Sequence, residues 1–301
     1  MTSPWTAIEF RAMGTDCRVV ADVDDAAHRA VELVRGLERT WSRFRPDSEV
    51  SELNRRAGRV CLVSELTFEL LARAERARRH TGGAFNPLML DQLEAIGYDR
   101  SWEHVVDDES SVVPATPGCQ LPIELYDDVR AVRLPEGTRF DPGGIGKGLA
   151  GDLVAAALRL GGAESVQIEL GGDVRVDGVP WSGDEWQVRV ADDDHHNAHA
   201  ATIGLTAGGV ATSSVVRRRW RRGADELHHL LDPATGTSAV TDLDAVTAVA
   251  PELWWAEVVA KVALTAGSNG ARQVFERFGA TGVVVAPGPR YDSVTRCEVA
   301  A

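Results

Sequence analysis

Residues 140–152 spell Phe-Asp-Pro-Gly-Gly-Ile-Gly-Lys-Gly-Leu-Ala-Gly-Asp, and the prediction of the fold starts from this glycine stretch. Four glycines fall within six positions, Lys147 stands among them, and the apolar run from Leu149 to Leu160 predicts a helix. A glycine-rich turn before a helix suits an anionic group, because main-chain N–H groups point outward and the helix dipole favours negative charge. The residues alone leave two interpretations open: a site for a phosphate-bearing ligand, or a tight turn without one.

Two familiar phosphate motifs do not explain the stretch. Lys147 is followed by Gly148 instead of Ser or Thr, so the stretch is not a Walker A loop. Gly146, Gly148 and Gly151 satisfy the spacing G-x-G-x-x-G, but Asp141-Pro142 precedes them where a dinucleotide fold needs a strand leading into the turn. The match to a dinucleotide-binding motif is therefore weak.

Composition narrows the class of protein and of partner. The chain has 301 residues, 44% of them hydrophobic and 26% charged, as in an ordinary globular protein. A formal net charge of −13 argues against nucleic acid or an anionic membrane as partner. The N-terminus lacks the pattern of a secretion signal, and no apolar run reaches the roughly 18 residues of a membrane span. Four scattered cysteines without a C-x-x-C pair fit reduced thiols, so we predict a cytoplasmic protein with no membrane segment.

Periodicity and capping patterns predict helices mixed with antiparallel strand pairs, an α+β fold. Ser48 and Ser64 have the pattern of helix caps, and Asn86-Pro87 has the pattern of a helix start, with Asn as the cap and Pro as the first residue. The predicted helices cover residues 24–41, 49–54, 65–80, 87–96, 149–160, 251–266 and 269–278. The predicted strands cover two segments within 8–23 and residues 123–126, 131–134, 166–170, 174–176, 186–190, 201–205, 209–212, 227–231, 244–250 and 282–286. No repeat or low-complexity linker divides the chain, so residues 1–301 are predicted to form a single domain.

Two charged clusters have simple structural explanations. The run from Asp192 to His199 contains three aspartates and three histidines, but it falls between two predicted strands, where a polar turn needs no metal ion. Arg217 to Arg222 is the only basic block in an acidic chain. Its default interpretation is a solvated strand end, and a contact to phosphate or to an acidic partner is the alternative.

Two further patterns carry chemically useful side chains. The segment from His228 to Gly236 ends a predicted strand in histidines, Asp232 and a Pro/Gly turn, which suits either converging polar groups or a turn held by that carboxylate. Glu257 and Lys261 stand four residues apart on a predicted helix. Taken alone, that spacing predicts an ordinary helical ion pair worth a few tenths of a kcal/mol.

Seven motifs in order resemble the ApbE family, the FAD:protein FMN transferases, from about Phe10 to Gly267. They are Met13-Gly14-Thr15; Ser42-x-Phe44-x-x-x-Ser48-Glu49-Val50-Ser51-x-Leu53-Asn54; Thr81-Gly82-Gly83-Ala84-Phe85-Asn86-Pro87; Asp141-x-Gly143-Gly144-Ile145-Gly146-Lys147-Gly148; Leu170-Gly171-Gly172-Asp173; Ala211-Thr212-Ser213; and His229-Leu230-Leu231-Asp232-Pro233-x-Thr235-Gly236.

The resemblance implies a fold and an activity. The expected architecture is ApbE-like and T-fold-related, with two α/β lobes and FAD bound between them. Members typically cleave the FAD pyrophosphate with Mg²⁺ and pass FMN to a hydroxyl of a target protein, and some hydrolyse FAD to FMN and AMP. Both reactions require neutralisation of the pyrophosphate, activation of an oxygen nucleophile and stabilisation of the departing phosphate. The expected partners are therefore FAD and an acceptor protein that carries a Ser or Thr flavinylation site.

The resemblance also implies roles for individual residues. His229 matches a histidine that is a candidate base, and the carbonyl of Gly146 together with Glu257 matches positions that hold the metal ion. Residues of the glycine stretch, Gly143 to Lys147, would cradle the pyrophosphate. The positions expected to bind FAD are Met13, Phe44, Asn54, Ala84, Phe85, Asn86, Gly143, Gly144, Gly146, Lys147, Leu149 and Leu231.

The metal site departs from the family pattern. The family's metal helix usually carries Asp and Thr four residues apart, where this chain has Glu257 and Lys261. An ammonium group cannot ligate Mg²⁺ and would repel it. We therefore predict that the Lys261 ammonium takes the place of Mg²⁺ beside the pyrophosphate, and the alternatives are an outward Lys261 paired with Glu257, FAD hydrolysis, or FAD binding without turnover. Asn86 also departs, since the family has Asp there.

Overall fold

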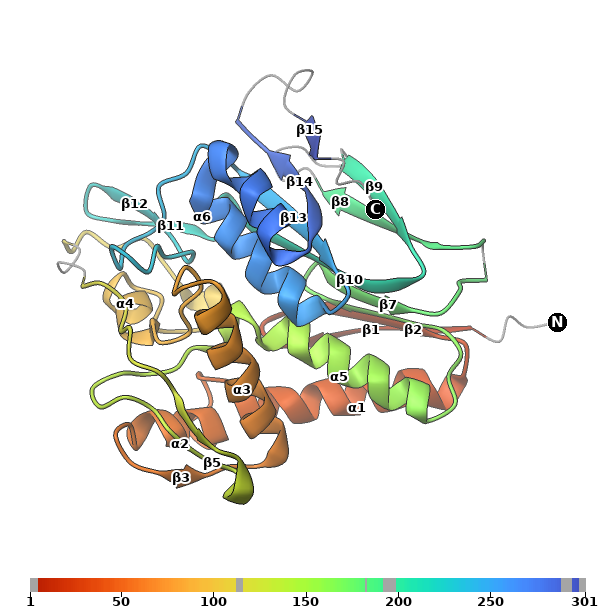
Figure 1. Cartoon of the computed structure of the whole chain (residues 1–301), viewed down its shortest axis with the longest axis horizontal. Coiled ribbons are helices and arrows are strands. Elements are labelled where there is room, and N and C mark those ends of the chain that lie inside the picture. The colour runs from red at the N-terminus through yellow and green to blue at the C-terminus, as the bar shows by residue number, and fades with distance from the viewer. Residues whose placement is uncertain (1–4, 112–115, 182, 192–198, 288–293, 298–301) are drawn as a thin grey trace. The chain divides into compact units, whose positions relative to one another are not determined.

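The computed structural model of this chain describes residues 5–111, 116–181, 183–191, 199–287 and 294–297. They form helices and antiparallel sheets (Figure 1), which confirms the α+β prediction. The chain divides into two compact units, unit 1 (Met1–Glu38, Ile145–Ser214 and Thr241–Ala301) and unit 2 (Arg39–Gly144 and Val215–Val240). The glycine stretch is thus where the chain passes from unit 2 back into unit 1. That residues 1–301 act as a single domain, with FAD between two lobes, stays a prediction.

Unit 1 is built on an eight-stranded sheet in which all neighbouring strands are antiparallel. The strands, in spatial order, are β1 (Thr6–Ala12), β2 (Thr15–Ala21), β6 (Val166–Leu170), β7 (Asp173–Asp177), β10 (Ala207–Ser214), β13 (Ala245–Ala250), β14 (Thr281–Val285) and β15 (Val294–Cys297). A separate hairpin pairs β8 (Trp186–Ala191) with β9 (His199–Leu205).

Three helices belong wholly or mainly to unit 1: α1 (Asp24–Trp41), α5 (Gly146–Leu160) and α6 (Leu253–Phe278). Helix α1 has the predicted bounds, and its apolar residues Ala27, Val31, Val34 and Leu37 are buried. Helix α6 is interrupted at Gly267, whose φ of +69° and ψ of −179° are not helical. The two helical segments predicted on either side of that glycine are therefore present.

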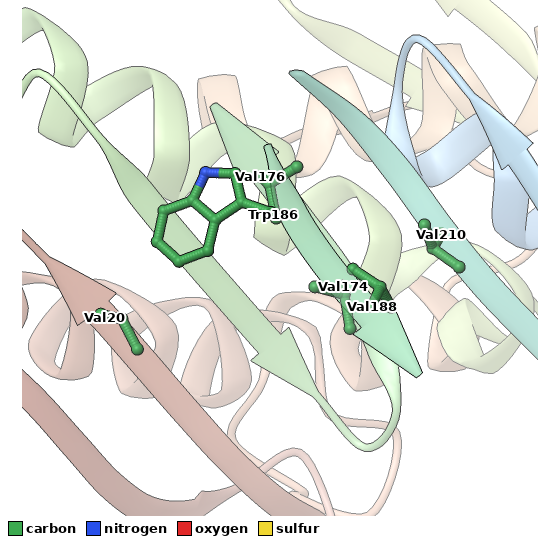
Figure 2. Packing of buried hydrophobic residues seen from close by; sticks show 6 residues of the cluster. All are labelled: Val20, Val174, Val176, Trp186, Val188 and Val210. Carbon is green, nitrogen blue, oxygen red and sulfur yellow. The ribbon is translucent and has the colours of Figure 1, made fainter. Parts of the chain in front are cut away.

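The hairpin β8–β9 supplies part of the apolar core of unit 1. Along β7, Val174 and Val176 are buried on one face while Arg175 belongs to the other, as the two-residue period of a strand requires. Figure 2 shows the buried cluster that results, formed by Val20, Val174, Val176, Trp186, Val188 and Val210. Each such side chain contributes about 1.5–3 kcal/mol when fully buried. The opposite face of β7 carries polar side chains and lies against α5.

Unit 2 contains short helices and small sheets. Its α-helices are α2 (Glu49–Arg55), α3 (Glu65–His80) and α4 (Leu90–Ala95), and its 3₁₀ turns are η1 (Trp102–His104), η2 (Asp127–Val129) and η3 (Pro142–Gly144). One of its sheets has the order β3 (Cys61–Leu62), β5 (Ala131–Arg133) and β4 (Glu124–Tyr126). The other pairs β11 (Arg219–Arg222) with β12 (Asp225–His228). The predicted caps are confirmed, because Ser48 Oγ accepts from Ser51 N at 3.0 Å and Ser64 Oγ from Thr67 N at 3.3 Å.

The predicted start of α4 was wrong. The helix begins at Leu90 instead of Pro87, because the Asn86 side chain accepts a hydrogen bond from Leu88 N at 3.0 Å and closes a local turn there.

Other boundaries also differ from the predictions. Helix α5 begins at Gly146 instead of Leu149, and strand β12 ends at His228 instead of Leu231. Leu231 makes only an isolated bridge to Ser238. Strands β3, β11 and β15 were not predicted; β3 has two residues and β11 lies in the arginine block, where charge obscures the alternation.

No helix among the described residues combines the length and the apolar character needed to cross a bilayer. A cytoplasmic location stays a prediction.

Candidate functional site

The glycines at the start of α5 are required by close packing against α6. A Cβ added at Gly148 would lie 2.6 Å from Trp254 Cα, and one added at Gly151 would lie 2.7 Å from Leu253 Cδ2. Such distances are far shorter than carbon–carbon contact. Two of the glycines that suggested an anion-binding turn therefore serve the contact between the two helices.

Helices α5 and α6 cap each other. Glu257 of α6 accepts a hydrogen bond from Gly148 N, in the first turn of α5, at 2.8 Å. Asp152 of α5 accepts from Leu253 N at 3.0 Å and from Trp254 N at 2.9 Å, in the first turn of α6. Each carboxylate thus satisfies N–H groups that a helix start leaves without an intrahelical partner. Burial raises the pKa of Asp152 to about 6, although these two N–H groups and Arg175 lower it.

Four charged side chains, which we call the charged cluster (Lys147, Asp173, Glu257 and Lys261), meet beside the start of α5. Lys147 Nζ contacts Asp173 Oδ2 and lies 3.4 Å from Glu257 Oε1. Lys261 Nζ lies 3.2 Å from that same Glu257 oxygen. The other Asp173 oxygen accepts from Thr212 N at 3.2 Å. The charges of two ammonium groups and two carboxylates cancel within the cluster.

Glu257 is the anion at the centre of the charged cluster. Its residue is 2% exposed. Burial alone would favour the protonated acid, but the ammonium groups of Lys147 and Lys261 outweigh it and lower the pKa of Glu257. The ion pair with Lys261 matches the predicted helical spacing, yet Lys261 is only 21% exposed and the carboxylate is shared with Lys147. The pair is therefore part of a buried network and not a solvated helix-surface pair.

The side chains of the charged cluster do not fit a magnesium ion. Mg²⁺ requires near-octahedral oxygen ligands at about 2.0–2.1 Å, whereas both Glu257 oxygens already accept from N–H groups. The Lys261 ammonium would repel a divalent cation bound beside it. In the described part of the chain, no three His, Cys, Asp or Glu side chains converge as a metal-binding group. That Gly146 and Glu257 hold a metal ion stays a prediction.

In unit 2, two contacts fix the chain as it enters the glycine stretch. Asn54 Nδ2 donates to Phe140 O at 2.9 Å, and Asn54 Oδ1 accepts from Phe140 N at 2.7 Å, so the amide pairs with the main chain as a strand would. Arg43 Nε lies 3.0 Å from Asp141 Oδ1, and the side chains of these residues are 5% and 15% exposed. An added Cβ at Gly143 would lie 2.9 Å from the Asp141 carboxylate, so a larger residue there would have to displace that carboxylate.

The turn that contains Ala84, Phe85 and Asn86 is held by its own side chains. Thr81 Oγ1 accepts from Phe85 N at 3.0 Å. Asn86 Nδ2 donates to Cys119 O at 2.9 Å, which an aspartate at this position could not do. The Asn86 amide is therefore bonded on both sides within unit 2, since its oxygen accepts from Leu88 N.

An aromatic cluster (Phe44, Tyr98, Trp220 and His229) lies elsewhere in unit 2. The Tyr98 ring centroid is 6.2 Å from that of Phe44, 5.9 Å from that of Trp220 and 6.3 Å from that of His229. Phe44 remains 40% exposed. The neighbouring His228 is buried and bonded to main-chain atoms, and burial lowers its pKa. Of the two histidines, His228 is structural and His229 is the candidate for chemistry.

The remaining predicted residues are spread over both units. Met13 has a positive φ of 53°, and its N–H donates to Glu38 Oε1 at 2.6 Å. Leu149 is buried in α5, and Leu231 is half-buried. The structure brings Lys147, Glu257 and Lys261 into one cluster in unit 1 and Phe44 and His229 into another in unit 2. The acidic and histidine-rich run of residues 192–199 falls outside the described residues, apart from the backbone of its last residue.

The arginine block is largely bonded within unit 2. Arg219 pairs with Glu226 across the hairpin at 3.2 Å, and Arg222 donates to Ala95 O at 2.7 Å. Arg218 Nη1 donates to the Tyr98 hydroxyl at 3.2 Å. Arg219 to Arg222 form a strand of their own, β11, in which Trp220 is buried and Arg219 and Arg221 are exposed.

A protein-family model described as the ApbE family matches residues 13–285 of the chain. The chain belongs to the ApbE family. Among curated relatives, a FAD:protein FMN transferase of Treponema pallidum is 29% identical over 307 residues, covering 92% of this chain and 83% of its own. One of Klebsiella pneumoniae is 30% identical over 234 residues, covering 75% and 71%. The crystal structure of an ApbE protein from Thermotoga maritima superposes with a TM-score of 0.85 at 25% identity, covering 98% of this chain and 97% of its own.

Both clusters also involve residues that the sequence does not predict as site residues. Asp173 closes one of the recognised motifs but received no role, although its carboxylate contacts Lys147. Arg43 and Tyr98 stand next to or between recognised motifs and were not singled out. The position of Arg43 directly before Phe44 could have indicated it. No local pattern indicates Tyr98, because its contacts come from distant segments.

Proposed function

We propose that this chain binds FAD and transfers FMN from it to a Ser or Thr hydroxyl of an acceptor protein, releasing AMP. The observation that carries the proposal is the charged cluster at the start of α5, within an ApbE-family chain. Lys147 and Lys261 place two ammonium groups beside a helix start, a combination that favours phosphate oxygens.

The proposed transfer is a substitution at the phosphorus of the FMN half of FAD. The acceptor hydroxyl oxygen forms a new bond to that phosphorus, while the bond from the phosphorus to the bridging oxygen breaks. The electron pair of the broken bond leaves with AMP, and the hydroxyl proton passes to His229 and then to solvent. Positioning and charge neutralisation supply most of the rate enhancement in phosphoryl transfer.

We propose further that the Lys261 ammonium supplies the charge that Mg²⁺ supplies in typical family members. Glu257 holds Lys261 Nζ at 3.2 Å, and an ammonium group has three donors, so it can donate to this carboxylate and still donate to a phosphate oxygen. The support for this role is the geometry of Glu257, whose oxygens are engaged by N–H groups.

A second candidate function is FAD binding without turnover. It is favoured by the charge balance of the cluster, since two carboxylates offset two ammonium groups and leave less positive charge for the departing phosphate. Hydrolysis of FAD to FMN and AMP differs from transfer only in the nucleophile, which would be water.

The test is incubation of the full-length protein with FAD, in Mg²⁺ or in EDTA, followed by chromatography of the nucleotides. Equal AMP release in both conditions is expected if Lys261 replaces the metal ion. Release that EDTA abolishes and Mg²⁺ restores would overturn that role while preserving the transferase. Stoichiometric FAD with no AMP in either condition would support the second candidate.

A matched pair of variants tests Lys261 directly. Lys261→Thr together with Glu257→Asp rebuilds the family's usual pair, so Mg²⁺-dependent AMP release is expected to rise. Arg272→Thr is the control, because Arg272 and Glu276 form an exposed pair of the same spacing on the same helix. A rebuilt pair with no response to Mg²⁺ would contradict the proposal.

A further inference from the structure

Tyr98 occupies the centre of the aromatic cluster, and neither its sequence position nor the proposed reaction assigns it a role. Its residue is 8% exposed, and its ring contacts three aromatic rings within 6.3 Å. Burial raises the pKa of its hydroxyl, so the ring stays neutral at physiological pH. Aromatic pairs in tilted or edge-to-face contact contribute about 0.5–1.5 kcal/mol each beyond area burial. The ring is therefore held firmly.

Arg43 holds one side of Tyr98. Its guanidinium carbon lies 4.8 Å from the Tyr98 ring centroid and 4.1 Å from that of Phe44, and Nη2 donates to Tyr98 O at 2.9 Å. The side chain is 5% exposed, and its remaining contact is the ion pair with Asp141 at 3.0 Å. A planar guanidinium can stack on rings and bind a carboxylate at once, which an ammonium cannot.

Arg218 holds the hydroxyl end of Tyr98. Its Nη1 donates to Tyr98 Oη at 3.2 Å. It belongs to the arginine block, and the next ring along the block, Trp220, packs against Tyr98 and donates to Ile96 O at 2.8 Å. The arginine block thus supplies both a hydrogen-bond donor to the Tyr98 hydroxyl and an aromatic ring that packs against the Tyr98 ring.

His229 meets the Tyr98 ring at an interplanar angle of 72°. The main chain on either side of His229 is fixed, because His228 and Leu230 are buried and joined by a hydrogen bond from Leu230 N to His228 Nδ1 at 3.3 Å. With the backbone held, the contact to Tyr98 restricts the rotation of the imidazole about its side-chain bonds.

We propose that Tyr98 is a positioning residue that fixes the imidazole of His229, and that Arg43 and Arg218 hold Tyr98 in place for that purpose. The proposal rests on the proposed function, in which His229 takes the proton of the acceptor hydroxyl. A general base must lie within hydrogen-bond reach of the proton that it removes.

The first test is the nuclear magnetic resonance spectrum of the full-length protein labelled in histidine. The His229 ring signals are assigned as those that vanish in His229→Gln. The field of a neighbouring aromatic ring shifts such signals, so they are expected to move strongly in Tyr98→Leu and only slightly in Tyr98→Phe, which keeps the ring and loses the hydrogen bond from Arg218. Unchanged His229 signals in folded Tyr98→Leu would overturn the positioning role, whether or not the protein turns over FAD.

The second test is AMP release from FAD by the same variants. Misplacement of a reacting group by about 1 Å costs up to about a hundredfold in rate, so kcat is expected to fall about tenfold to a hundredfold in Tyr98→Leu with KM for FAD unchanged. Tyr98→Phe is expected to restore most of kcat, because the ring remains and only the hydrogen bond from Arg218 is lost. A parallel rise of KM in Tyr98→Leu, or failure of Tyr98→Phe to restore kcat, would contradict the role.

Arg218 provides a variant that leaves the tyrosine in place. Arg218→Ala removes the same hydrogen bond as Tyr98→Phe and is expected to match it, with a small fall of kcat and a small movement of the His229 signals, whereas Arg219→Ala, which alters an exposed residue of the same block, is expected to change neither. Identical behaviour of the two variants would overturn the link from the arginine block to His229. Full activity of His229→Gln in an active enzyme would instead overturn the base role in the proposed function, and the signal shifts would still decide the positioning role.

Discussion

The charged cluster of unit 1 and the aromatic cluster of unit 2 hold their functional side chains by different means. In the charged cluster, Lys147 of α5 and Lys261 of α6 share one oxygen of Glu257, and each of the two helices caps the other. In the aromatic cluster, rings from separate segments meet around Tyr98, and two arginines hold that ring. The first arrangement depends on the balance of charge and the second on the shape of the rings, so the two should respond to different substitutions.

The largest effect is expected where helix contact leaves no space. Gly148→Ala places a methyl group 2.6 Å from Trp254 Cα, so the variant is expected to lose about 3 kcal/mol or more of unfolding free energy, or to fail to fold. Urea denaturation measures this loss. Gly183→Ala is the control, because an added Cβ there meets no atom within 4 Å. Equal stability of the two variants would show that α5 and α6 can separate without loss.

Removal of the Glu257 charge at the centre of the charged cluster should lower the unfolding free energy nearly as much. Glu257→Gln keeps the shape but leaves two half-buried ammonium groups facing one carboxylate, and about 2–3 kcal/mol of unfolding free energy should be lost. Glu276→Gln, which breaks an exposed pair on the same helix, should change stability by less than about 0.5 kcal/mol. A small effect at Glu257 would mean that charge balance does not hold this region together.

The cap at the start of α6 should give a pH-dependent stability. Because burial raises the pKa of Asp152 to about 6, above its unfolded value of 3.8, the folded chain binds a proton more readily than the unfolded chain between these values. The contribution of Asp152 to stability is therefore present near pH 4 and is lost as pH rises through 6, by about 2 kcal/mol.

Urea denaturation of the wild type and of Asp152→Asn from pH 4 to pH 7 checks this sign. The stability of the wild type relative to the variant should decrease with rising pH. An increase with pH would mean that the two N–H groups and Arg175 outweigh burial at Asp152.

The smallest effect is expected in the aromatic cluster. Arg43→Lys preserves the charge beside Asp141 but removes the planar group that stacks on Phe44 and Tyr98, and about 1 kcal/mol should be lost. Arg55→Lys, at an exposed pair with Glu52, is the control and should be neutral. If Arg43→Lys were also neutral, charge and not ring shape would hold this region, and the contrast between the two clusters would disappear.

Local signals in the sequence predicted most of the fold. Ser48 and Ser64 marked their helices because a hydroxyl cap acts on N–H groups two or three residues away. The helix start predicted at Asn86 was wrong, because the same kind of side-chain hydrogen bond closes a turn there and does not begin a helix. The arginine block concealed β11, since its buried member, Trp220, stands alone between charged residues.

The candidate site was predictable only where its residues share one element. Glu257 and Lys261 were paired from their spacing, and the pair is present. The contacts of Lys147 with Asp173 and Glu257 join residues 26 and 110 positions apart, and no local pattern encodes such pairs. The use of Gly148 N by Glu257 was likewise hidden, because the glycine suggested a free amide for a ligand.

The mutual capping of α5 and α6 has a consequence for how the chain opens. Since Glu257 holds the amide of Gly148 and Asp152 holds those of Leu253 and Trp254, neither helix start can fray without releasing an acceptor needed by the other. The two starts should therefore exchange their amide hydrogens with solvent deuterium as one cooperative segment, at a common rate, although the residues are about a hundred positions apart in the chain.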